Sequence, residues 1–182
     1  MTSSTAAIVA TYNQDGYIAE AIESISDQVD EVIVVDDSSS DATFQVLNSL
    51  RKSNVLVLRN EERSGVSVSC NRAVNESSAE ILILRGGDDR SLPGRALSQV
   101  AALKNSDVSL VHSAPIIIDA LGRRLPDELS AEFIDIPETT DPLHFLYFTS
   151  NYICAPSVTV RRQDYLRFGG FMPGIDLLQD FQ

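Results

Sequence analysis

The chain has 182 residues, of which 43% are hydrophobic, and its 14 basic and 26 acidic side chains give a formal net charge of −12. This length suits one domain with a substantial core, and an acidic chain without a basic stripe is a poor candidate for a nucleic-acid-binding protein. The two cysteines, Cys70 and Cys154, are too few for a disulfide scaffold and lack the spacing of a zinc site.

The chain contains no transmembrane signal. No apolar run approaches the roughly 18 residues that cross a bilayer, and the N-terminus lacks the basic residues of a signal peptide. We therefore expect a cytoplasmic protein, either free or held peripherally at the inner face of the membrane.

Short apolar runs alternate with helical periodicity over most of the chain. The runs predict strands at Ala6–Ala10, Val32–Val35, Val55–Leu58, Ile81–Leu84 and Val108–Val111. Their starts recur about every 25 residues, a spacing typical of strand–helix–strand units. The predicted helices present their apolar residues at Tyr17, Ile18, Ala21, Ile22 and Ile25; at Phe44, Leu47 and Leu50 after an Asp41 cap; at Val66, Cys70, Ala73 and Val74 after a Ser64 cap; and at Leu97, Val100 and Ala101 after Pro93.

The pattern changes after Ser113. Residues 115–119 predict a strand that ends in a turn at 120–123, and residues 126–141 predict a loop with a short helix. Another strand is expected at Ile153–Val160, followed by a turn at Gly169–Gly170–Phe171. The whole pattern predicts an α/β fold with a mainly parallel central sheet and helices on both faces.

Two acidic turns each follow a buried strand. Asp36 and Asp37 follow the second strand, and Asp88 and Asp89 follow the fourth. Ligands bind outside the carboxyl ends of strands in open α/β sheets, so the two turns could meet across one crevice. Clustered carboxylates repel one another unless a cation lies between them, and a divalent metal carrying phosphates suits this arrangement.

Several segments together resemble the family 2 inverting glycosyltransferases, which have the GT-A fold. In chain order they are residues 8–13, 35–43, 60–71, Asp88–Asp89 followed by Pro93, 157–162, Gly169–Gly170–Phe171 and Gln179–Asp180. The resemblance implies one GT-A-like domain over residues 1–182. Within it, residues 1–113 form a Rossmann-like half that binds the nucleotide-sugar, and residues 114–182 form the acceptor and catalytic half. We expect this chain to be the N-terminal catalytic domain, truncated at its C-terminus.

The resemblance also implies an activity. The protein would move a sugar from a nucleotide diphosphate-sugar donor to an acceptor with inversion, assisted by a divalent cation, Mg²⁺ or Mn²⁺. A role in polysaccharide or cell-envelope glycan synthesis follows, with a glycan, a lipid-linked or a protein acceptor all open. The nucleobase, the sugar and the oligomeric state stay open as well.

Residues of the first half have expected roles in donor binding. Thr11 and Tyr12 end the first strand, where a base can lie against the backbone and an aromatic ring. The resemblance implies that Asp36 and Asp37 accept a hydrogen bond from the nucleobase; alternatively they only cap the next helix, a role that suits Asp41 better. Gly65 and Asn71 match the family segment that packs a helix start against the nucleotide.

Asp88 and Asp89 stand where the family has its metal-binding motif, usually Asp-x-Asp-Asp. Gly86 takes the position of the first Asp, and Arg85 stands where an apolar residue is common. One or two carboxylates suffice for Mg²⁺ or Mn²⁺ when phosphate oxygens and waters complete the shell. We expect Asp88 to be the main ligand and Asp89 to assist it, with weak metal binding in the absence of nucleotide. The alternative is a solvated acidic turn.

Asp180 is the expected general base, because the family places an Asp shortly after its Gly-Gly-Phe turn. Gln179 replaces the Glu that usually precedes it. Inversion requires a carboxylate that takes the proton of the acceptor hydroxyl. The alternative is that Asp180 belongs to a frayed chain end.

The pattern has three rival functions. A non-catalytic nucleotide-sugar-binding module would result from Gly86 and a missing C-terminal segment. A nucleotidylyltransferase needs a glycine-rich basic loop after the first strand, which residues 10–14 do not provide. A dinucleotide-binding dehydrogenase is excluded because no GxGxxG follows that strand.

Overall fold

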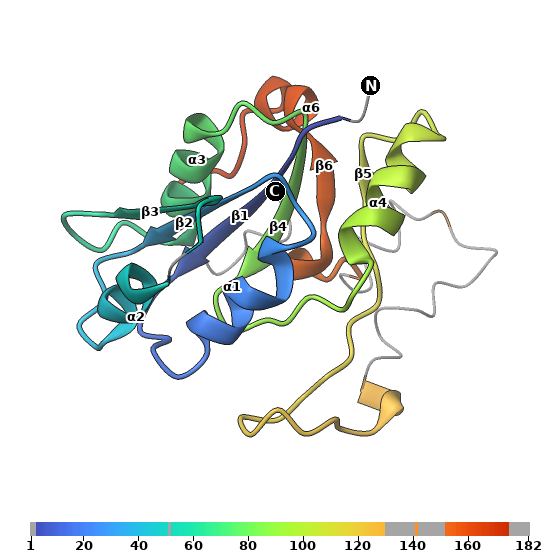
Figure 1. Cartoon of the computed structure of the whole chain (residues 1–182). Coiled ribbons are helices and arrows are strands. Elements are labelled where there is room, and N and C mark those ends of the chain that lie inside the picture. Colours follow the sequence, from blue (N-terminus) through green and yellow to red (C-terminus); the bar gives the residue numbers. More distant parts are fainter. Residues whose placement is uncertain (1–2, 51, 130–140, 142–151, 175–182) are drawn as a thin grey trace.

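A computed structural model describes residues 3–50, 52–129, 141 and 152–174, which form an α/β fold around one sheet (Figure 1). Its strands are β1 (Thr5–Thr11), β2 (Glu31–Asp36), β3 (Val55–Arg59), β4 (Ile81–Gly86), β5 (Leu110–Val111) and β6 (Thr159–Arg161). They lie in the order β3-β2-β1-β4-β6-β5. The first four are parallel, whereas β6 runs antiparallel to β4 and β5. The predicted mainly parallel sheet is confirmed.

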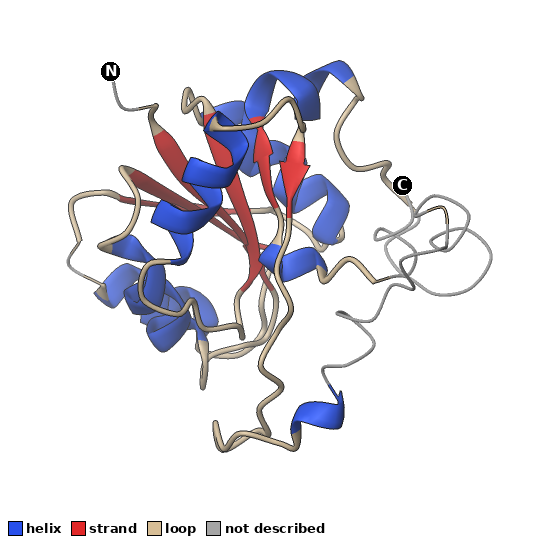
Figure 2. Cartoon of the chain, turned by 90° about the vertical axis from the view of Figure 1, so that its right-hand side faces the viewer, coloured by secondary structure: helices blue, strands red, loops and turns tan. Residues whose placement is uncertain are grey.

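Helices cover both faces of the sheet, as Figure 2 shows from the side. One face carries α1 (Ile18–Ser26), α2 (Thr43–Ser49) and α4 (Arg95–Lys104); the other carries α3 (Val66–Glu76) and α6 (Arg162–Arg167). Strands β1 and β2 are apolar along their length because both of their faces are covered. Each fully buried Ile or Val stabilises the fold by about 1.5–3 kcal/mol relative to its exposure, so residues such as Ile8, Ile22 and Ile33 hold the layers together.

The inward face predicted for α4 is wrong. Leu97 is 78% exposed, and the buried residues are Ala96, Gln99 and Leu103. Gln99 turns inward because its side chain satisfies polar groups of the sheet: it donates to the Ser157 carbonyl at 2.8 Å and accepts from the Thr159 hydroxyl at 2.7 Å. These hydrogen bonds outweigh the hydrophobic gain of burying Leu97 instead.

Two strand predictions in the second half are also corrected. The predicted strand at 153–160 is only three residues long, because a 3₁₀ turn, η2 (Ala155–Ser157), with Pro156 in its first turn precedes β6. The segment 115–119 forms no strand; it makes a single antiparallel bridge, Ile118 with Arg124. The turn predicted after it is present, and the Asp119 carboxylate fixes it by accepting from the Leu121 and Arg123 amides, each at 2.9 Å.

Within the described part of the chain, no helix combines the length and the hydrophobicity that crossing a bilayer requires.

Candidate functional site

The candidate site lies at the carboxyl ends of β1, β2 and β4. Strand order reverses between β1 and β4, because the chain leaves β1 toward β2 and β3 and returns on the other side as β4. Such a reversal opens a crevice for ligands in parallel sheets. The predicted residues Thr11, Asp36 and Asp37 lie on one side of this reversal and Asp88 and Asp89 on the other.

The Asp37 carboxylate joins three segments of the chain. Its Oδ1 accepts from the Asn60 amide group at 2.6 Å and from the Ser64 backbone N–H at 2.9 Å, and its Oδ2 accepts from the Gly65 N–H at 2.9 Å. Burial raises the pKa of Asp37, but these hydrogen bonds outweigh that effect and hold the pKa below its ordinary value. Asp37 therefore fixes the start of α3, whereas the start of α2 is held by Asp41, which accepts from the Thr43 N–H at 2.9 Å.

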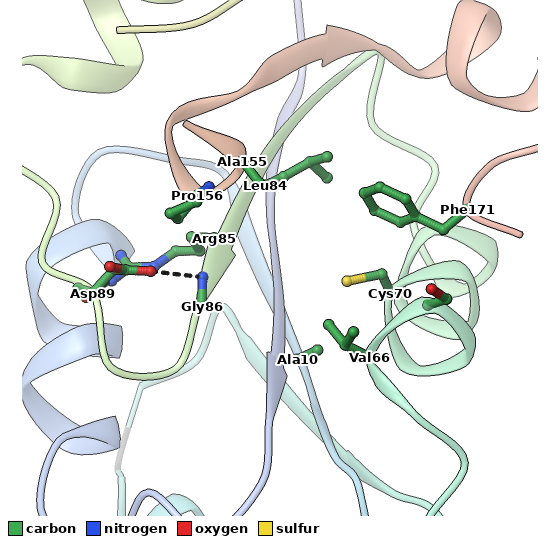
Figure 3. Close-up of a pocket in the computed structure, with 11 residues that line it drawn as sticks. Ala10, Val66, Cys70, Leu84, Arg85, Gly86, Asp89, Ala155, Pro156 and Phe171 are labelled. Carbon is green, nitrogen blue, oxygen red and sulfur yellow. Dashed lines mark hydrogen bonds between the residues drawn. The ribbon is translucent and has the colours of Figure 1, made fainter. Parts of the chain in front are cut away.

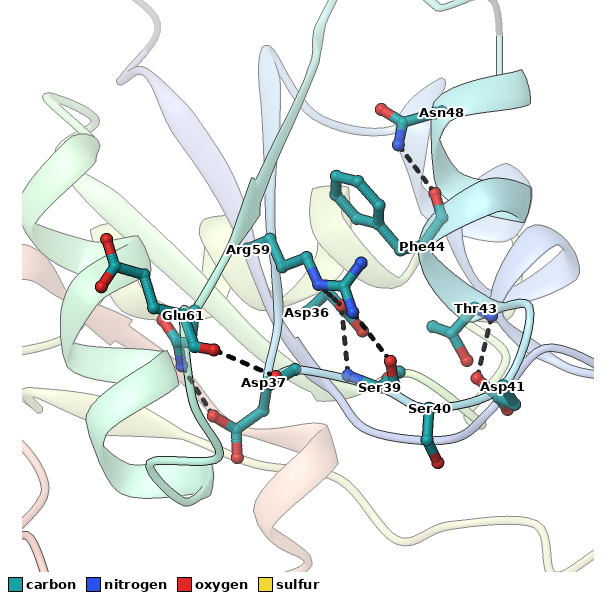
Figure 4. Close-up of polar contacts among 12 residues, drawn as sticks. Asp36, Asp37, Ser39, Ser40, Asp41, Thr43, Phe44, Asn48, Arg59 and Glu61 are labelled. Carbon is teal, nitrogen blue, oxygen red and sulfur yellow. Dashed lines mark hydrogen bonds and ion pairs between the residues drawn. The ribbon is translucent and has the colours of Figure 1, made fainter.

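Asp36 is fully buried. Its Oδ2 lies 3.3 Å from the Arg59 Nε and accepts from the Ser39 N–H at 3.3 Å, and its Oδ1 is buried without a hydrogen-bond partner. Figure 4 shows the Arg59 guanidinium between Asp36 and the Phe44 ring, whose centroid is 4.7 Å away. The carboxylates of Asp36 and Asp37 thus both have partners within the fold. That they also bind a nucleobase stays a prediction.

Asp88 and Asp89 form a tight turn directly after β4. Asp88 is exposed, whereas Asp89 is half-buried and its Oδ2 accepts from the Gly86 N–H at 3.2 Å. Burial and the charge of Asp88 raise the pKa of Asp89. A Cβ at Gly86 would lie 2.7 Å from Asp89 Oδ2 and 2.9 Å from Asp88 Oδ1. The absent side chain at position 86 therefore gives both carboxylates room to fold back over the strand end.

The Arg85 side chain lies on the α1 face of the sheet and holds this turn by hydrogen bonds. It is buried in β4 and donates to the Ser24 hydroxyl of α1 at 3.3 Å, to the Ser91 hydroxyl at 3.1 Å and to the Asp89 carbonyl. Burial and the charge of Arg95 lower the pKa of Arg85 to about 10, while Asp89 and Asp88 act in the opposite direction. Arg85 stays charged at neutral pH, and its guanidinium holds the turn against α1.

Gly87 brings the same turn against the end of β1. Its backbone lies so close to Thr11 that an added Cβ would be 2.6 Å from the Thr11 hydroxyl and 2.3 Å from Gln14 Oε1. These two groups are hydrogen-bonded to each other at 2.7 Å. The close approach therefore links the two halves of the candidate site.

We predict that Gly87→Ala lowers the free energy of unfolding by about 1–3 kcal/mol, because the added methyl group overpacks a tight contact. The same variant should weaken nucleotide binding, since the turn must shift. Gly16→Ala is the matched control, because a Cβ at Gly16 meets nothing within 4 Å. Urea unfolding measures the first effect and calorimetry with UDP the second. Equal stability of the two variants would contradict the close contact.

The predicted residue Asn71 connects α3 to the Gly-Gly-Phe turn. Its Oδ1 accepts from the Tyr165 hydroxyl at 2.7 Å and from the Phe171 N–H at 3.0 Å, and its amide group donates to the Phe171 carbonyl at 2.7 Å. Gly170 has φ of 70°, and a Cβ there would lie 2.5 Å from Asn71 Oδ1. Asn71 thus positions the turn, and its contact with a nucleotide stays a prediction.

Gly65 and Tyr12 flank the crevice. Gly65 caps α3 with φ of 91°, a backbone conformation that favours glycine, and directs its N–H to Asp37. The Tyr12 ring is half-buried under the Arg63 guanidinium, which lies 4.2 Å from the ring centroid. Arg63 is exposed, so this edge of the crevice combines an aromatic face with a positive charge.

A cavity of about 140 Å³ opens between α3 and the ends of β1 and β4 (Figure 3). Its walls are mostly apolar, and the charged residues that line it are Arg85 and Asp89. In Figure 3, Asp89 and Phe171 stand on opposite sides of the opening. The cavity is smaller than a typical site for a drug-sized ligand, about 300–1,000 Å³, so a larger ligand would extend over the open carboxyl edge.

The expected base, Asp180, lies outside the described residues. Sequence reasoning placed Asn60 in the family segment 60–71 but missed its hydrogen bond to Asp37 and the burial of Arg85. An arginine that directly continues an apolar strand run was a signal for the second; the partnership of Asn60 with Asp37 had none, because the two residues belong to different strand ends.

The Glycosyl transferase family 2 profile matches residues 6–168. The chain belongs to this family. Among its relatives are a glycosyltransferase of Methanocaldococcus jannaschii, 28% identical over 66% of this chain and 44% of the relative, and the poly(ribitol-phosphate) β-N-acetylglucosaminyltransferase TarS of Staphylococcus aureus, 32% identical over 73% of this chain and 24% of TarS.

Two solved glycosyltransferase structures have the same fold. TarS residues 1–349 with UDP superpose with a TM-score of 0.72 at 25% identity, over 97% of this chain and 52% of that one. The mannosyltransferase PcManGT of Pyrobaculum calidifontis, in complex with GDP-mannose and Mn²⁺, gives 0.67 at 19% identity, over 94% of this chain and 48% of that one. The chain therefore spans about half, or less, of the length of the relatives it matches. Its GT-A fold and its membership in the Glycosyl transferase family 2 are established.

Proposed function

We propose that this glycosyltransferase binds a nucleotide diphosphate-sugar at the carboxyl edge of β1, β2 and β4 and transfers the sugar to an acceptor hydroxyl with inversion. The observation that carries the proposal is that two acidic turns follow β2 and β4, on either side of β1, and that Gly87 of the second turn packs against Thr11 at the end of β1. The TarS structures with UDP and with UDP-GlcNAc support a nucleotide-sugar donor.

In this proposal the nucleoside lies along Thr11 and Tyr12, beside the start of α3. The Tyr12 ring offers a face for the base, and the exposed Arg63 attracts the negative charge of the donor. Gly65 and Asn71 would shape this wall. Asp36 or Asp37 could read the base only by adding a hydrogen bond to those it already makes.

The residues fit a divalent cation. Asp88 and Asp89 supply hard oxygen ligands; burial and, second to it, the charge of Asp88 raise the pKa of Asp89, and a bound cation would stabilise its charged form. Asp88 and Asp89 would hold the cation, which neutralises charge on the departing diphosphate when bound. Within the described part of the chain, no cluster of three His, Cys, Asp or Glu side chains is present that could hold a metal without a ligand's help, and so we expect metal and nucleotide to bind together.

The proposed transfer is a single displacement. The acceptor oxygen forms a bond to the anomeric carbon while the bond from that carbon to the diphosphate oxygen breaks and leaves its electron pair on the diphosphate. The acceptor's proton passes to Asp180, the proposed base.

Calorimetry of UDP and GDP binding tests the donor site. We expect one of the two to bind at least about tenfold more tightly with Mn²⁺ than with EDTA, a difference of about 1.4 kcal/mol, and Asp88→Asn to remove the difference. Asp107→Asn, in the exposed turn after α4, is the matched control for the lost charge. Affinity that is equal in Mn²⁺ and EDTA would contradict the metal assignment, and binding without any transfer would favour a non-catalytic module.

A further inference from the structure

A second and larger cavity, of about 430 Å³, lies beyond the Asp88–Asp89 turn from the cavity beside α3. Its wall combines the start of α1, the Asp88–Asp89 turn, the segment 115–122 and the chain before β6. Asp89 and Pro156 line both cavities. The residues assigned to the nucleoside, Thr11, Tyr12 and Gly65, line neither of the two cavities.

We propose that this larger cavity binds the acceptor, and that the acceptor is a neutral saccharide. The inference rests on the proposed function. In a direct displacement the attacking hydroxyl and the departing diphosphate occupy opposite sides of the sugar carbon, so two substrates need two compartments that meet at the diphosphate. Two cavities that share Asp89 have this arrangement.

The lining suits a sugar ring. Tyr17 is 43% exposed and presents an aromatic ring to the cavity, and the C–H face of a pyranose packs flat against such a ring. Hydroxyl groups both donate and accept hydrogen bonds: Glu20 and Asp88 can accept from them and Arg90 can donate. The volume lies in the range of small-molecule sites.

The polar groups of this cavity are held in place. Arg90 Nη2 lies 2.6 Å from Glu20 Oε2, and a Cβ at Gly122, where φ is 75°, would lie 2.6 Å from an Arg90 guanidinium nitrogen. The turn at 119–123 therefore rests directly on the Arg90–Glu20 pair. This contact joins the segment 115–122 to α1 and fixes the width of the cavity.

The charges of the lining argue against an anionic acceptor. Arg90 offsets Glu20, and Arg123 offsets Asp119 by an ion pair of 2.7 Å, which leaves Asp88 and Asp89 in excess. In a donor complex, Asp88, Asp89 and the diphosphate would together offset the charge of the cation, so no positive charge would be left over for a phosphate on the acceptor. The lining thus favours a neutral saccharide over a polyol phosphate.

Saturation-transfer NMR on the chain with UDP and Mn²⁺ tests the proposal. The probes are methyl β-N-acetylglucosaminide, methyl β-glucoside and, as the anionic alternative, ribitol 5-phosphate. We expect at least one methyl glycoside to bind, Tyr17→Ala to weaken its binding at least about fivefold, and Tyr17→Phe to retain it. Phe168→Ala is the matched control, because Phe168 is 76% exposed and lines neither cavity. UDP affinity, measured by calorimetry, should be the same in all four proteins.

Loss of UDP binding in the parent chain would contradict the proposed donor site, whatever the saccharides do. UDP binding without Tyr17-dependent saccharide binding would overturn the acceptor assignment alone. Weaker UDP binding in a folded Tyr17→Ala variant would place the cavity in the donor site and overturn the assignment too. Tighter binding of ribitol 5-phosphate than of both glycosides would overturn the neutral class.

Discussion

Asp180→Asn is expected to lower the rate of sugar transfer by about two to four orders of magnitude, the usual contribution of a general base, while donor affinity stays the same. Asparagine keeps the shape of the side chain but cannot take the proton of the acceptor hydroxyl. The loss should therefore appear in kcat, with UDP binding in Mn²⁺ unchanged by calorimetry.

Asp164→Asn is the control for this variant, since it removes one charge from the first turn of α6, a helix with no buried residues. Transfer is assayed with the best-binding methyl glycoside as acceptor. Transfer at the parent rate by the Asp180→Asn protein would refute the assignment and return the search for the base to other carboxylates near the Asp88–Asp89 turn.

The parallel half of the fold was predictable because its signals are local. Strands β1, β2 and β4 each contain a run of four or five consecutive apolar residues, which a sheet covered on both faces accommodates, and α1 presents Ile18, Ile22 and Ile25 at helical spacing. The cap of α2 by Asp41 depends on a residue two positions away. Each of these features is decided within one element and its immediate neighbours.

The features that sequence reasoning missed depend on distant partners. Gln99 faces inward because Thr159, 60 residues further along the chain, supplies a hydrogen bond. Arg85 is buried because Ser24 of α1 and Ser91 of the loop before α4 accept hydrogen bonds from it. The alternation of side chains along β4 places Arg85 on the α1 face, but only the folded chain shows acceptors there.

The candidate site also combines features that follow from the local sequence with features that depend on distant residues. The position of both acidic turns at strand ends followed from the sequence, because parallel strands end at one edge. The partners of Asp37 did not follow, since Ser64 lies 27 residues away and belongs to the next strand–helix unit. The larger cavity was not predictable at all, because four separate segments form its wall.

Asp37→Ala is expected to destabilise the fold by about 2–4 kcal/mol, because it leaves the Asn60 side chain and the Ser64 and Gly65 amides without their acceptor. Asp41→Ala, which removes the acceptor of the Thr43 N–H at a more exposed helix start and of the exposed Asp15 N–H, should cost about 1 kcal/mol. Urea unfolding at neutral pH measures both. Equal losses would mean that Asp37 contributes no more than a local cap.

The pH dependence of the stability difference between the parent and Asp37→Ala tests whether the charge of the Asp37 carboxylate causes it. The folded-state pKa of Asp37 lies below its ordinary value, so its stabilisation is complete above the unfolded-state pKa of about 3.9 and is lost as the pH falls through the folded-state value. The stability gap between the parent and Asp37→Ala should therefore be constant from neutral pH down to about pH 5 and narrow below about pH 4. A gap that widens toward acid pH would mean that the three donors stabilise the neutral form of the carboxyl group.

A binding measurement tests whether Asp37 also contacts the nucleobase. If it does, calorimetry at neutral pH should show weaker UDP binding by Asp37→Ala than by Asp41→Ala under conditions where both variants are fully folded.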